Sequence, residues 1–530
     1  MKRRAFILFF IIIFLFGATS VRLYDLSTGV LKASEMSSAK TVDVVTLRGS
    51  VYDCGMRLLT NGEHDVYAAA KPSNEALAAL KGKVLPDVFE SVMQRMSKGN
   101  PVALKVDSDI LQSGNIISVK IPRRYASAHT ACHIIGSINS DGHGISGIEK
   151  AYDAVLSDNN SEVSFRFSAN ALGRVMLGEG ISVSGNTVPK NGVVLSIDRD
   201  IQQITEAVLD SSGADCAAAV VMEIENGAIR ACVSRPLFNQ NNVAASLDDH
   251  RSPLINRAFL PFSVGSVFKP VVAAAALESG IDRSFSYNCK GSVEFNGVTF
   301  HCHKKDGHGI VDMEGAVAYS CNTYFIALAH EIGADNIIRT ASDFGFGKKT
   351  SLADGMESAG GNLPSAEELD SKAAVANISF GQGKLTATPL QICSMMATIA
   401  RGGDFIEPYL IEGEVDKDGK VTRIYRYGKR RIISSPTAEL LQGFLEKVVA
   451  YGSGSRAKCE AVTVAGKTAT AQTGKSVNGE EIYNAWFAGY FPADNPKYAV
   501  AILKEDGGEG ALSCAPVFKM IAEKLSDLCE

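Results

Sequence analysis

The sequence predicts a mixed α+β protein whose larger, C-terminal part is an antiparallel sheet with helices on both faces. Strand-like runs occur near the two ends of this part, and the stretch between them, residues 266–442, has a largely helical pattern. An antiparallel sheet brings the two ends together around such an inserted helical region. The composition fits a folded globular chain, because 46% of the 530 residues are hydrophobic and 21% are charged. A formal net charge of −5 argues against a strongly basic nucleic-acid-binding protein.

The chain begins with a segment that has the pattern of a membrane anchor, residues 1–22. Three basic residues, 2–4, precede the uncharged apolar stretch 5–21, which is close to the length that crosses the hydrocarbon core of a bilayer. Positive charge before the helix predicts a cytoplasmic N-terminus. A cleaved signal peptide is the alternative, since residues 17–20 are small. In both cases we expect the remainder of the chain to be exported, with one membrane span at most.

Residues 23–189 form a mixed, loop-rich region that we expect to be a separate α+β domain. Short alternating runs at 41–47 and 116–121 predict strands, and residues 74–96 have a helical pattern. The region contains no set of residues that would support catalysis.

From residue 190 the pattern changes to that of the predicted sheet domain, residues 190–530. Asp198 is a good N-cap for an amphipathic helix, and Asn226-Gly227 is typical of a type I′ hairpin turn. The elements expected in chain order are a strand over 193–197, a helix over 199–209, hairpin strands over 217–224 and 228–234, the helical middle, strands over 461–470, 485–491 and 498–504, and a helix over 515–528.

Ser266 and Lys269 are the first candidates for chemistry. They stand at the start of an apolar helix expected over 267–277, so that positions i and i+3 share one face. A neutral lysine beside a serine hydroxyl can take its proton and produce an activated nucleophile. A serine at a helix start also lies near free backbone N–H groups.

Two further short motifs follow, and each is weak evidence alone. They are Ser320-Cys321-Asn322, after a helical run, and Lys467-Thr468-Ala469-Thr470, on an expected strand. The Gly-Lys-Thr sequence at 466–468 does not predict a phosphate-binding loop, because Ala461 occupies the position of the glycine that such a loop requires.

Taken in order, the three motifs resemble the Ser-x-x-Lys, Ser-x-Asn and Lys-Thr-Gly set of the penicillin-binding and serine β-lactamase superfamily. The flanking sequences resemble class B penicillin-binding proteins, the monofunctional transpeptidases: Asn256-Arg257-Ala258, Phe380-Gly381-Gln382-Gly383, Thr388-Pro389-Leu390-Gln391, Ala485-Trp486-Phe487-Ala488-Gly489-Tyr490, Arg48-Gly49-Ser50-Val51-Tyr52-Asp53 and Gly147-Ile148-Glu149. The resemblance covers nearly the whole chain. It implies an antiparallel sheet with an added all-helical subdomain, an elongated α+β pedestal at 23–189 and one transmembrane helix.

The resemblance also implies roles for the motif residues. Ser266 would attack the carbonyl of the penultimate D-alanine of a peptidoglycan stem peptide. Lys269 would act as the base, kept neutral by burial and by a second cation. Ser320 would relay a proton to the leaving amine, and Asn322 would orient Lys269 and hold the substrate amide.

The third motif would bind the end of the substrate. Lys467 and Thr468 would hold the terminal carboxylate, since a cation beside a hydroxyl suits an anion. The backbone N–H groups of Ser266 and Thr470 would form the oxyanion hole. An amine of a neighbouring stem peptide would then take the acyl group, and β-lactams would acylate Ser266 as mimics of D-alanyl-D-alanine.

Ala469 is a departure from the family, which has glycine at this position. A glycine on this strand lets substrate backbone pass close by, so Ala469 predicts reduced or altered activity. It keeps open a second hypothesis, a catalytically weakened or inactive penicillin-binding scaffold. A D,D-carboxypeptidase or a β-lactamase is a third, against which the long pedestal argues. Cys321 replaces the serine usual in the middle of the second motif, at a position that varies across the superfamily.

No cofactor and no metal site are predicted. A group of possible metal ligands, His301, Cys302, His303 and His308, is interpreted as polar residues of a surface loop, because no ligand spacing repeats. Cys289 and Cys302 flank a hairpin expected over 291–300, and a disulfide between them is an open alternative.

The expected partners follow from the resemblance. They are peptidoglycan stem peptides on lipid II-derived glycan strands, β-lactams as covalent inhibitors, an integral-membrane SEDS-family glycosyltransferase, and other membrane proteins of division or sporulation. A separate polymerase is expected because the chain has no region of glycosyltransferase size. The motifs are most similar to the division and sporulation branch of class B, which implies septal or spore cell-wall synthesis.

Overall fold

The protein is described here by a computed structural model that covers residues 2–35, 38–158, 161–170, 172–185, 189, 191–295, 297–424, 428–477 and 479–528. It contains two compact units. The first consists of residues 1–48, 63–124 and 160–189, and the second of residues 49–62, 125–159 and 190–530.

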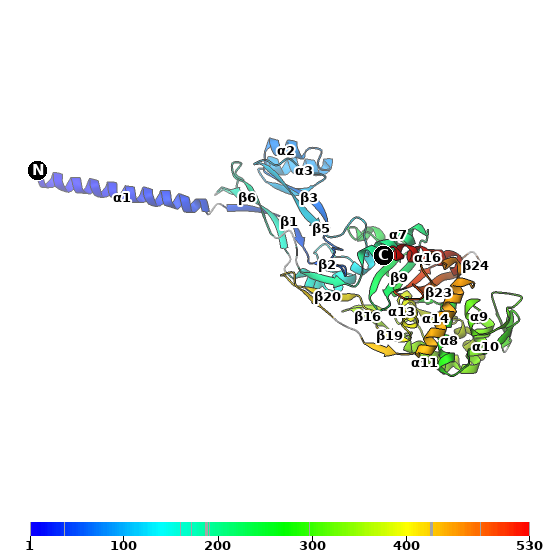
Figure 1. Ribbon diagram of the computed structural model, residues 1–530. Coiled ribbons are helices and arrows are strands. Elements are labelled where there is room, and N and C mark those ends of the chain that lie inside the picture. The colour runs from blue at the N-terminus through cyan, green and yellow to red at the C-terminus, as the bar shows by residue number, and fades with distance from the viewer. Residues whose placement is uncertain are drawn as a thin grey trace. The chain divides into compact units, whose positions relative to one another are not determined.

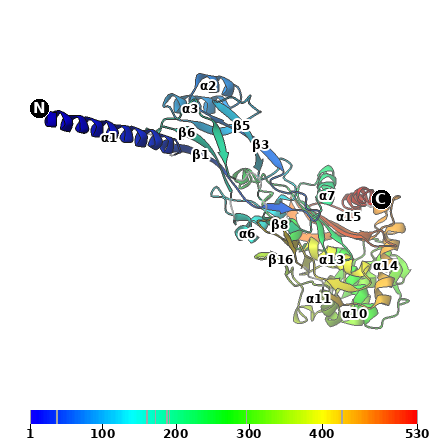
Figure 2. The same cartoon turned by 60° about the vertical axis from the view of Figure 1, so that its left-hand side comes forward.

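The first unit contains two three-stranded antiparallel sheets, with strand orders β1-β6-β7 and β4-β3-β5. Helices α2 and α3 cover the second sheet (Figure 2) and bury Leu80, Val92 and Met96 against it. Its elements are α1 (Lys2–Glu35), β1 (Ser38–Leu47), β3 (Glu63–Ala70), α2 (Asn74–Leu80), α3 (Pro86–Ser97), β4 (Val102–Val106), β5 (Ile116–Arg123), β6 (Ser161–Ala169) and β7 (Ile181–Ser184). The helix expected over 74–96 is therefore two helices, since Pro86 begins α3.

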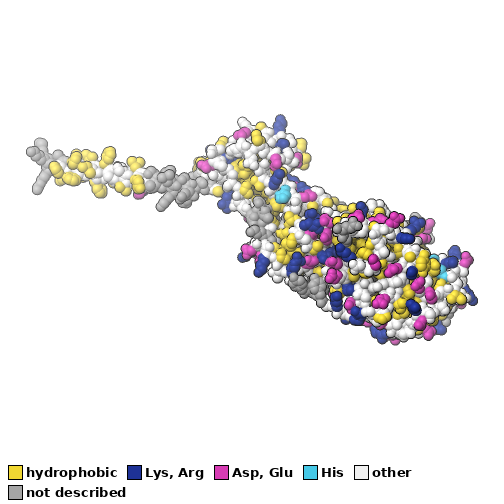
Figure 3. Space-filling model, viewed as in Figure 1, with side chains coloured by type: hydrophobic (Ala, Val, Ile, Leu, Met, Phe, Trp, Pro, Cys, Tyr) yellow, Lys and Arg dark blue, Asp and Glu magenta, His cyan; other side chains and the backbone are white. Residues whose placement is uncertain are grey.

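Between Phe6 and Tyr24, helix α1 presents apolar side chains to the outside (Figure 3). Its segment Phe6–Asp25 has a mean hydropathy of 2.4 and is, among the described residues, the one helix long and apolar enough to cross a membrane. Such a surface is costly in water, and its length and composition suit a single membrane span.

The second unit is built on a five-stranded antiparallel sheet, β10-β9-β25-β24-β23 (Figure 1). Strands from the beginning and the end of this part of the chain are neighbours, because β9 (Ala217–Glu223) pairs with β25 (Tyr498–Lys504). The remaining strands are β10 (Ile229–Arg235), β23 (Ala465–Val477) and β24 (Glu480–Phe491). The predicted antiparallel sheet is confirmed, and β23 lies at its edge.

Both faces of this sheet are buried, as successive residues of β24 show. Trp486, Ala488 and Tyr490 belong to one apolar cluster, which includes helices α8 (Lys269–Glu278) and α13 (Pro389–Ala400). Phe487 and Phe491 point the other way into a second cluster, with α7 (Arg199–Ser211) and α16 (Ala515–Ser526). Since side chains alternate along a strand, a strand buried on both faces is apolar at nearly every position.

The rest of the second unit is largely helical, with short strand pairs between the helices. Its helices are α4 (Cys132–Ile135), α5 (Gly147–Ala151), α6 (Asp153–Ser157), α7 (Arg199–Ser211), α8 (Lys269–Glu278), α9 (Met313–Ala318), α10 (Asn322–Ile332), α11 (Ala334–Asp343), α12 (Lys372–Ser379), α13 (Pro389–Ala400), α14 (Ser435–Ala450), α15 (Gly510–Ser513) and α16 (Ala515–Ser526), besides short 3-10 turns. Its other strands are β2 (Ser50–Tyr52), β8 (Gly192–Leu195), β11 (Phe262–Ser263), β12 (Tyr287–Cys289), β13 (Ser292–Phe295), β14 (Val298–His301), β15 (Gly309–Val311), β16 (Thr350–Ala353), β17 (Met356–Ser358), β18 (Thr386–Ala387), β19 (Asp404–Ile406), β20 (Ile411–Val415), β21 (Val421–Arg423) and β22 (Lys429–Arg431).

Residues 49–62 and 125–159 differ from the expected continuous domain over 23–189, because they belong to the second unit. Strand β2 pairs in parallel with β8 in a small sheet of order β2-β8-β20-β21. Arg57 donates to Asp53 at 2.7 Å and to Asp198, the N-cap of α7, at 3.0 Å. The β2–β8 pairing and the Arg57–Asp198 ion pair join segments that are distant in the chain, so neither can be derived from local sequence pattern.

The hairpin of β9 and β10 is confirmed, but its turn differs from the expected type I′. That type needs a positive φ at both central residues. Gly227 has φ +80°, whereas Asn226 is not among the described residues with positive φ. The Asn226 side chain instead accepts a hydrogen bond from the Ala228 N–H at 2.9 Å, which stabilises the turn in another way.

Candidate functional site

Ser266 and Lys269 are held at the junction between a 3-10 turn, η3 (Gly265–Phe268), and helix α8. Side chains three residues apart in a 3-10 turn are aligned, so the predicted proximity of the serine and the lysine has a structural basis. Gly265 has φ +59°, and a Cβ there would lie 3.1 Å from the Ala471 Cβ. The glycine thus allows the turn that carries Ser266 to approach strand β23.

Lys269 has no exposed surface, and its ammonium group is surrounded by the second motif. Its Nζ donates to the Ser320 carbonyl oxygen at 2.7 Å, to the Ser320 Oγ at 3.0 Å and to the Asn322 Oδ1 at 2.7 Å. Burial lowers the pKa of Lys269 to about 8. A substantial fraction of this amine is therefore neutral near physiological pH, as a general base requires.

The second motif forms a tight connection between helices α9 and α10. Ser320 has φ +57°, an uncommon conformation for serine, and directs both its carbonyl and its hydroxyl oxygen at Lys269. Cys321 is buried, and its N–H donates to the Ala316 carbonyl oxygen at 2.9 Å. Asn322 is the first residue of α10, and its Nδ2 donates to the His301 carbonyl oxygen at 3.0 Å.

The third motif lies on the edge strand β23. Lys467 is fully buried, and its Nζ donates to the Thr468 carbonyl oxygen at 3.1 Å and to the Ser453 Oγ at 3.5 Å. Burial lowers the pKa of Lys467 well below its usual value, and the charge of Lys269 lowers it further. The Thr468 hydroxyl lies 3.1 Å from the Ser453 hydroxyl.

A cavity of about 420 Å³ joins the three motifs. Six of the predicted residues line it: Ser266, Ser320, Asn322, Thr468, Ala469 and Thr470. Lys269 and Lys467 lie buried and hydrogen-bond the residues of this lining. The structure therefore brings together all eight residues predicted from the three motifs.

Sequence reasoning missed four residues that also line the cavity: His303, Ser453, Glu509 and Ala511. Ser453 follows Gly452, where a Cβ would lie 2.3 Å from the Ala318 carbonyl oxygen. The Gly-Ser-Gly sequence at 452–454 was a signal of such a close approach. His303 was considered only as a possible metal ligand, and Glu509 and Ala511 belong to no motif that would identify them.

Ala469 is 4% exposed and shares a strand face with Lys467 and Ala471. Its methyl group packs in the apolar cluster on the α8 side of the sheet, while the residue still borders the cavity. The alanine is thus accommodated within the core, and its cost to function depends on how closely substrate must approach the strand.

We expect Ala469→Gly to raise the rate of penicillin labelling by about 2- to 10-fold, because a glycine lets an extended ligand lie closer to β23. We also expect it to lower the free energy of unfolding by about 1 kcal/mol, through lost burial and greater chain freedom. Labelling kinetics and urea unfolding followed by Trp486 fluorescence measure the two effects. Ala471→Gly, on the same face but outside the cavity lining, should lose stability without faster labelling. An unchanged or slower labelling rate in Ala469→Gly contradicts this expectation.

Gly381 determines the position of the turn that carries Ser266. It has φ +76°, and a Cβ there would lie 2.0 Å from the Gly265 carbonyl oxygen. Its own carbonyl oxygen accepts a hydrogen bond from the Gly265 N–H at 2.9 Å. Any side chain at this position must therefore displace backbone next to Ser266.

We expect Gly381→Ala to lower the free energy of unfolding by about 3 kcal/mol, combining left-handed strain with the backbone clash. Gly280→Ala is the matched control, since it has φ +84° but nothing within 4 Å of the added Cβ. The control variant should lower the free energy of unfolding by about 1 kcal/mol, the cost of the left-handed strain alone. Urea unfolding read by the single tryptophan, Trp486, compares the two variants. Equal losses would show that the clash is relieved without cost.

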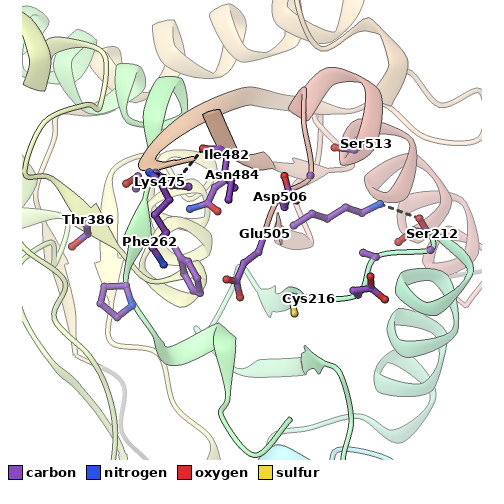
Figure 4. Close-up of a pocket in the computed structure, with 18 residues that line it drawn as sticks. Ser212, Cys216, Phe262, Thr386, Lys475, Ile482, Asn484, Glu505, Asp506 and Ser513 are labelled. Carbon is purple, nitrogen blue, oxygen red and sulfur yellow. Dashed lines mark hydrogen bonds between the residues drawn. The ribbon is translucent and has the colours of Figure 1, made fainter. Parts of the chain in front are cut away.

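A second, larger hollow of about 760 Å³ has a different set of lining residues (Figure 4). Cys216, Phe262, Glu505 and Asp506 are among its lining residues, and none of the eight motif residues is. Glu505 accepts a hydrogen bond from Arg257 there. The buried Lys504 also lines this hollow, but its amine donates to the Ser212 backbone carbonyl oxygen at 3.3 Å. The smaller cavity is the candidate active site because there a buried lysine donates to a serine hydroxyl beside a second serine.

The five-stranded sheet and this serine–lysine cavity define a protein of the penicillin-binding and serine β-lactamase fold. Comparison with known families matches residues 217–523 to the penicillin binding protein transpeptidase domain. The chain belongs to this family, as a class B penicillin-binding protein. The expected family and fold are therefore confirmed.

The chain is similar to several named proteins of this class. It is 31% identical over 426 residues to the penicillin-binding protein PbpB of Mycolicibacterium smegmatis, an alignment that covers 76% of this chain and 64% of that protein. It is 29% identical over 539 residues to stage V sporulation protein D of Bacillus subtilis, covering 94% of this chain and 81% of that one. The crystal structure of penicillin binding protein 3 of Mycobacterium tuberculosis, complexed with aztreonam, aligns at a TM-score of 0.66 and 26% identity, covering 92% of this chain and 97% of that one.

Proposed function

We propose that this protein is a peptidoglycan D,D-transpeptidase that cross-links stem peptides through an acyl-enzyme on Ser266. The observation that carries the proposal is the buried Lys269 amine, which donates to Ser320 and Asn322 beside the cavity that Ser266 lines. A lysine without exposed surface and with a lowered pKa is suited to accept a proton. The relatives named for D,D-transpeptidase activity support the same reaction.

In the proposed acylation, the Ser266 Oγ attacks the carbonyl carbon of the penultimate D-alanine. Its proton passes to the neutral Lys269 amine, and the Ser320 hydroxyl, 3.0 Å from that amine, carries a proton to the departing nitrogen. The peptide bond to the terminal D-alanine breaks as the ester forms. Backbone N–H groups of Ser266 and Thr470 stabilise the oxyanion, typically by about 3 kcal/mol per donor.

Lys467 and Thr468 bind the carboxylate of the terminal D-alanine in this proposal. Burial lowers the pKa of Lys467 in the empty site, and a carboxylate placed beside it would raise that pKa again by direct attraction. The charge of this lysine is therefore favoured when substrate is present. The same ion pair would strengthen the binding of an anionic substrate or of a β-lactam through its carboxylate.

Strand β23 offers a binding edge for the peptide itself. It is an end strand of the sheet, and Thr468, Ala469 and Thr470 border the cavity. An extended peptide can add to such an edge through main-chain hydrogen bonds. The acyl group held there would be attacked by an amine of a neighbouring stem peptide, which restores Ser266 and forms the cross-link.

We further propose a single-pass topology with the N-terminus in the cytoplasm and the chain after the membrane segment outside, where the rest of the first unit serves as pedestal and the second unit as catalytic domain. The basic residues 2–4 before the apolar segment Phe6–Asp25 support this orientation. A SEDS-family glycosyltransferase would supply the glycan strands. The similarity to stage V sporulation protein D supports a role in septal or spore cell-wall synthesis.

The test is reaction of the purified full-length chain, in detergent, with fluorescent penicillin and with a pentapeptide-bearing glycan polymer. We expect a penicilloyl adduct on the tryptic peptide that contains Ser266, and D-alanine release that matches dimer formation. An adduct without any cross-linking or D-alanine release would favour the scaffold hypothesis. D-alanine release without dimers would favour a carboxypeptidase, and absence of an adduct on folded protein would reject the acyl-enzyme.

A further inference from the structure

Three thiols and one imidazole converge beside the second motif of the active site. The ligand atoms of Cys289, Cys302, His308 and Cys321 all lie within 4.8 Å of one another. The three cysteines are at most 3% exposed, and His308 is partly buried. The group includes Cys302 and His308 of the loop that the sequence placed at the surface, but neither of its exposed neighbours, His301 and His303.

We propose that these four residues bind one zinc ion. A tetrahedral zinc site with Zn–S bonds of about 2.3 Å and a Zn–N bond of about 2.0 Å puts its ligand atoms about 3.5–3.8 Å apart. The Cys302 Sγ and the His308 Nδ1 are already 3.5 Å apart. No pair needs to close by more than about 1 Å, which is within the reach of small side-chain rotations.

Backbone pairing and close packing fix the positions of Cys289 and Cys302. Strand β12 ends at Cys289 and pairs with β15, in which Gly309 follows His308. Gly307 has φ +79°, and a Cβ there would lie 2.1 Å from the Cys289 carbonyl oxygen, so only glycine allows this approach. The N–H of Cys302 donates to the Gly291 carbonyl oxygen at 2.8 Å.

The remaining two ligands are oriented by their neighbours. The imidazole of His308 stacks on Tyr319, with ring centroids 5.9 Å apart and an interplanar angle of 18°. Cys321 is the N-cap residue of helix α10. Ligand side chains fixed before the metal arrives lower the entropic cost of binding.

The composition of the cluster favours zinc over a disulfide. Each cysteine among the described residues is free, and a disulfide between any two thiols would leave the third thiol and the imidazole without a role. Three cysteines and one histidine are a regular ligand set for structural zinc. Thiolates also disfavour magnesium and calcium, which prefer oxygen ligands.

Such an ion would join the loop over 289–309 to the active-site residues. Cys321 stands between Ser320 and Asn322, which both accept hydrogen bonds from Lys269. The Asn322 Nδ2 in turn donates to the carbonyl oxygen of His301, the residue before Cys302. The metal site is independent of the proposed function, since Ser266 is not among the ligands, and Ser266→Ala should retain the ion.

The test is the metal content of the full-length chain, expressed with zinc and purified in detergent without chelator or oxidant. We expect about one zinc ion per chain by elemental mass spectrometry, and at least a fivefold loss in Cys302→Ser, Cys321→Ser and His308→Ala. His301→Ala and Cys216→Ser are the matched controls, a neighbouring histidine and a cysteine outside the cluster, and should retain the ion.

Cobalt replacement covers the case in which a ligand variant fails to fold. The wild-type chain reconstituted with Co²⁺ should show thiolate-to-cobalt charge transfer and the intense visible bands of tetrahedral cobalt. The proposal is overturned by zinc below about a tenth of an ion per chain without those bands, by retention of zinc in the ligand variants, or by a native disulfide among Cys289, Cys302 and Cys321.

Discussion

Ser266→Ala is expected to abolish covalent penicillin labelling, with a fall of about 10⁶-fold in the acylation rate, because the variant lacks the oxygen that would form the ester. The substitution removes one partly buried hydroxyl at the start of α8, so that the fold should be retained. Fluorescent-penicillin labelling followed by gel analysis measures the loss, and intact-protein mass spectrometry checks for any remaining adduct.

Ser263→Ala provides the matched control. Ser263 lies three residues earlier, in β11, and borders the larger hollow instead of the motif cavity. Its backbone carbonyl oxygen, which accepts from the Trp486 Nε1 at 2.9 Å, is unaffected by the change. This variant should be labelled at the wild-type rate. Persistent labelling of Ser266→Ala would assign the adduct to another nucleophile and refute the proposed role.

Local sequence pattern was sufficient to predict the strands of the central sheet but not the strand pairing in the small sheet beside it. The apolar runs of β9, β24 and β25 predicted strands, since a strand buried on both faces has no polar alternation. Strand β23 was expected over 461–470 and is Ala465–Val477, because its second half carries exposed polar residues that resemble a loop. The pairing of β2 with β8 was not predictable, as three residues of strand carry too little signal.

The candidate site likewise contains residues that the sequence predicts and residues that it does not. The motif residues could be predicted because the three motifs, taken in order, resemble those of penicillin-binding proteins. Spacing alone supports only the neighbouring Ser266 and Lys269, three residues apart at a helix start. Ser453, Glu509 and His303 reach the cavity through the packing of distant segments, which local pattern does not encode. For the same reason, the sequence did not predict a metal site at Cys289, Cys302, His308 and Cys321. Cys321 comes from the second motif and not from the loop that carries the other candidate ligands.

Lys269→Met is expected to lower the acylation rate by about 10³- to 10⁴-fold, the contribution typical of a general base. Methionine has a similar length and fills the buried space without an ionisable group. The Ser320 and Asn322 oxygens would lose their donor, so stability must be checked through Trp486 fluorescence. Stopped-flow acylation at saturating penicillin separates a lost chemical step from lost binding.

Lys269→Arg distinguishes a base from a fixed cation. Arginine keeps a positive charge but does not deprotonate in the accessible pH range, so this variant should be as slow as Lys269→Met if the lysine acts as a base. Activity restored by arginine would instead mean that Lys269 acts only as a positive charge that orients Ser320 and Asn322.

The wild-type pH profile tests the same assignment without a substitution. Burial lowers the pKa of Lys269 to about 8, and the neutral amine is the active form. The acylation rate should therefore be low at acidic pH, rise about tenfold between pH 7 and pH 9, and then level off. The slow residual reaction of Lys269→Met should show no such rise. A wild-type rate that stays flat or falls across this range would exclude the neutral lysine as the base and leave proton removal to another group in the cavity.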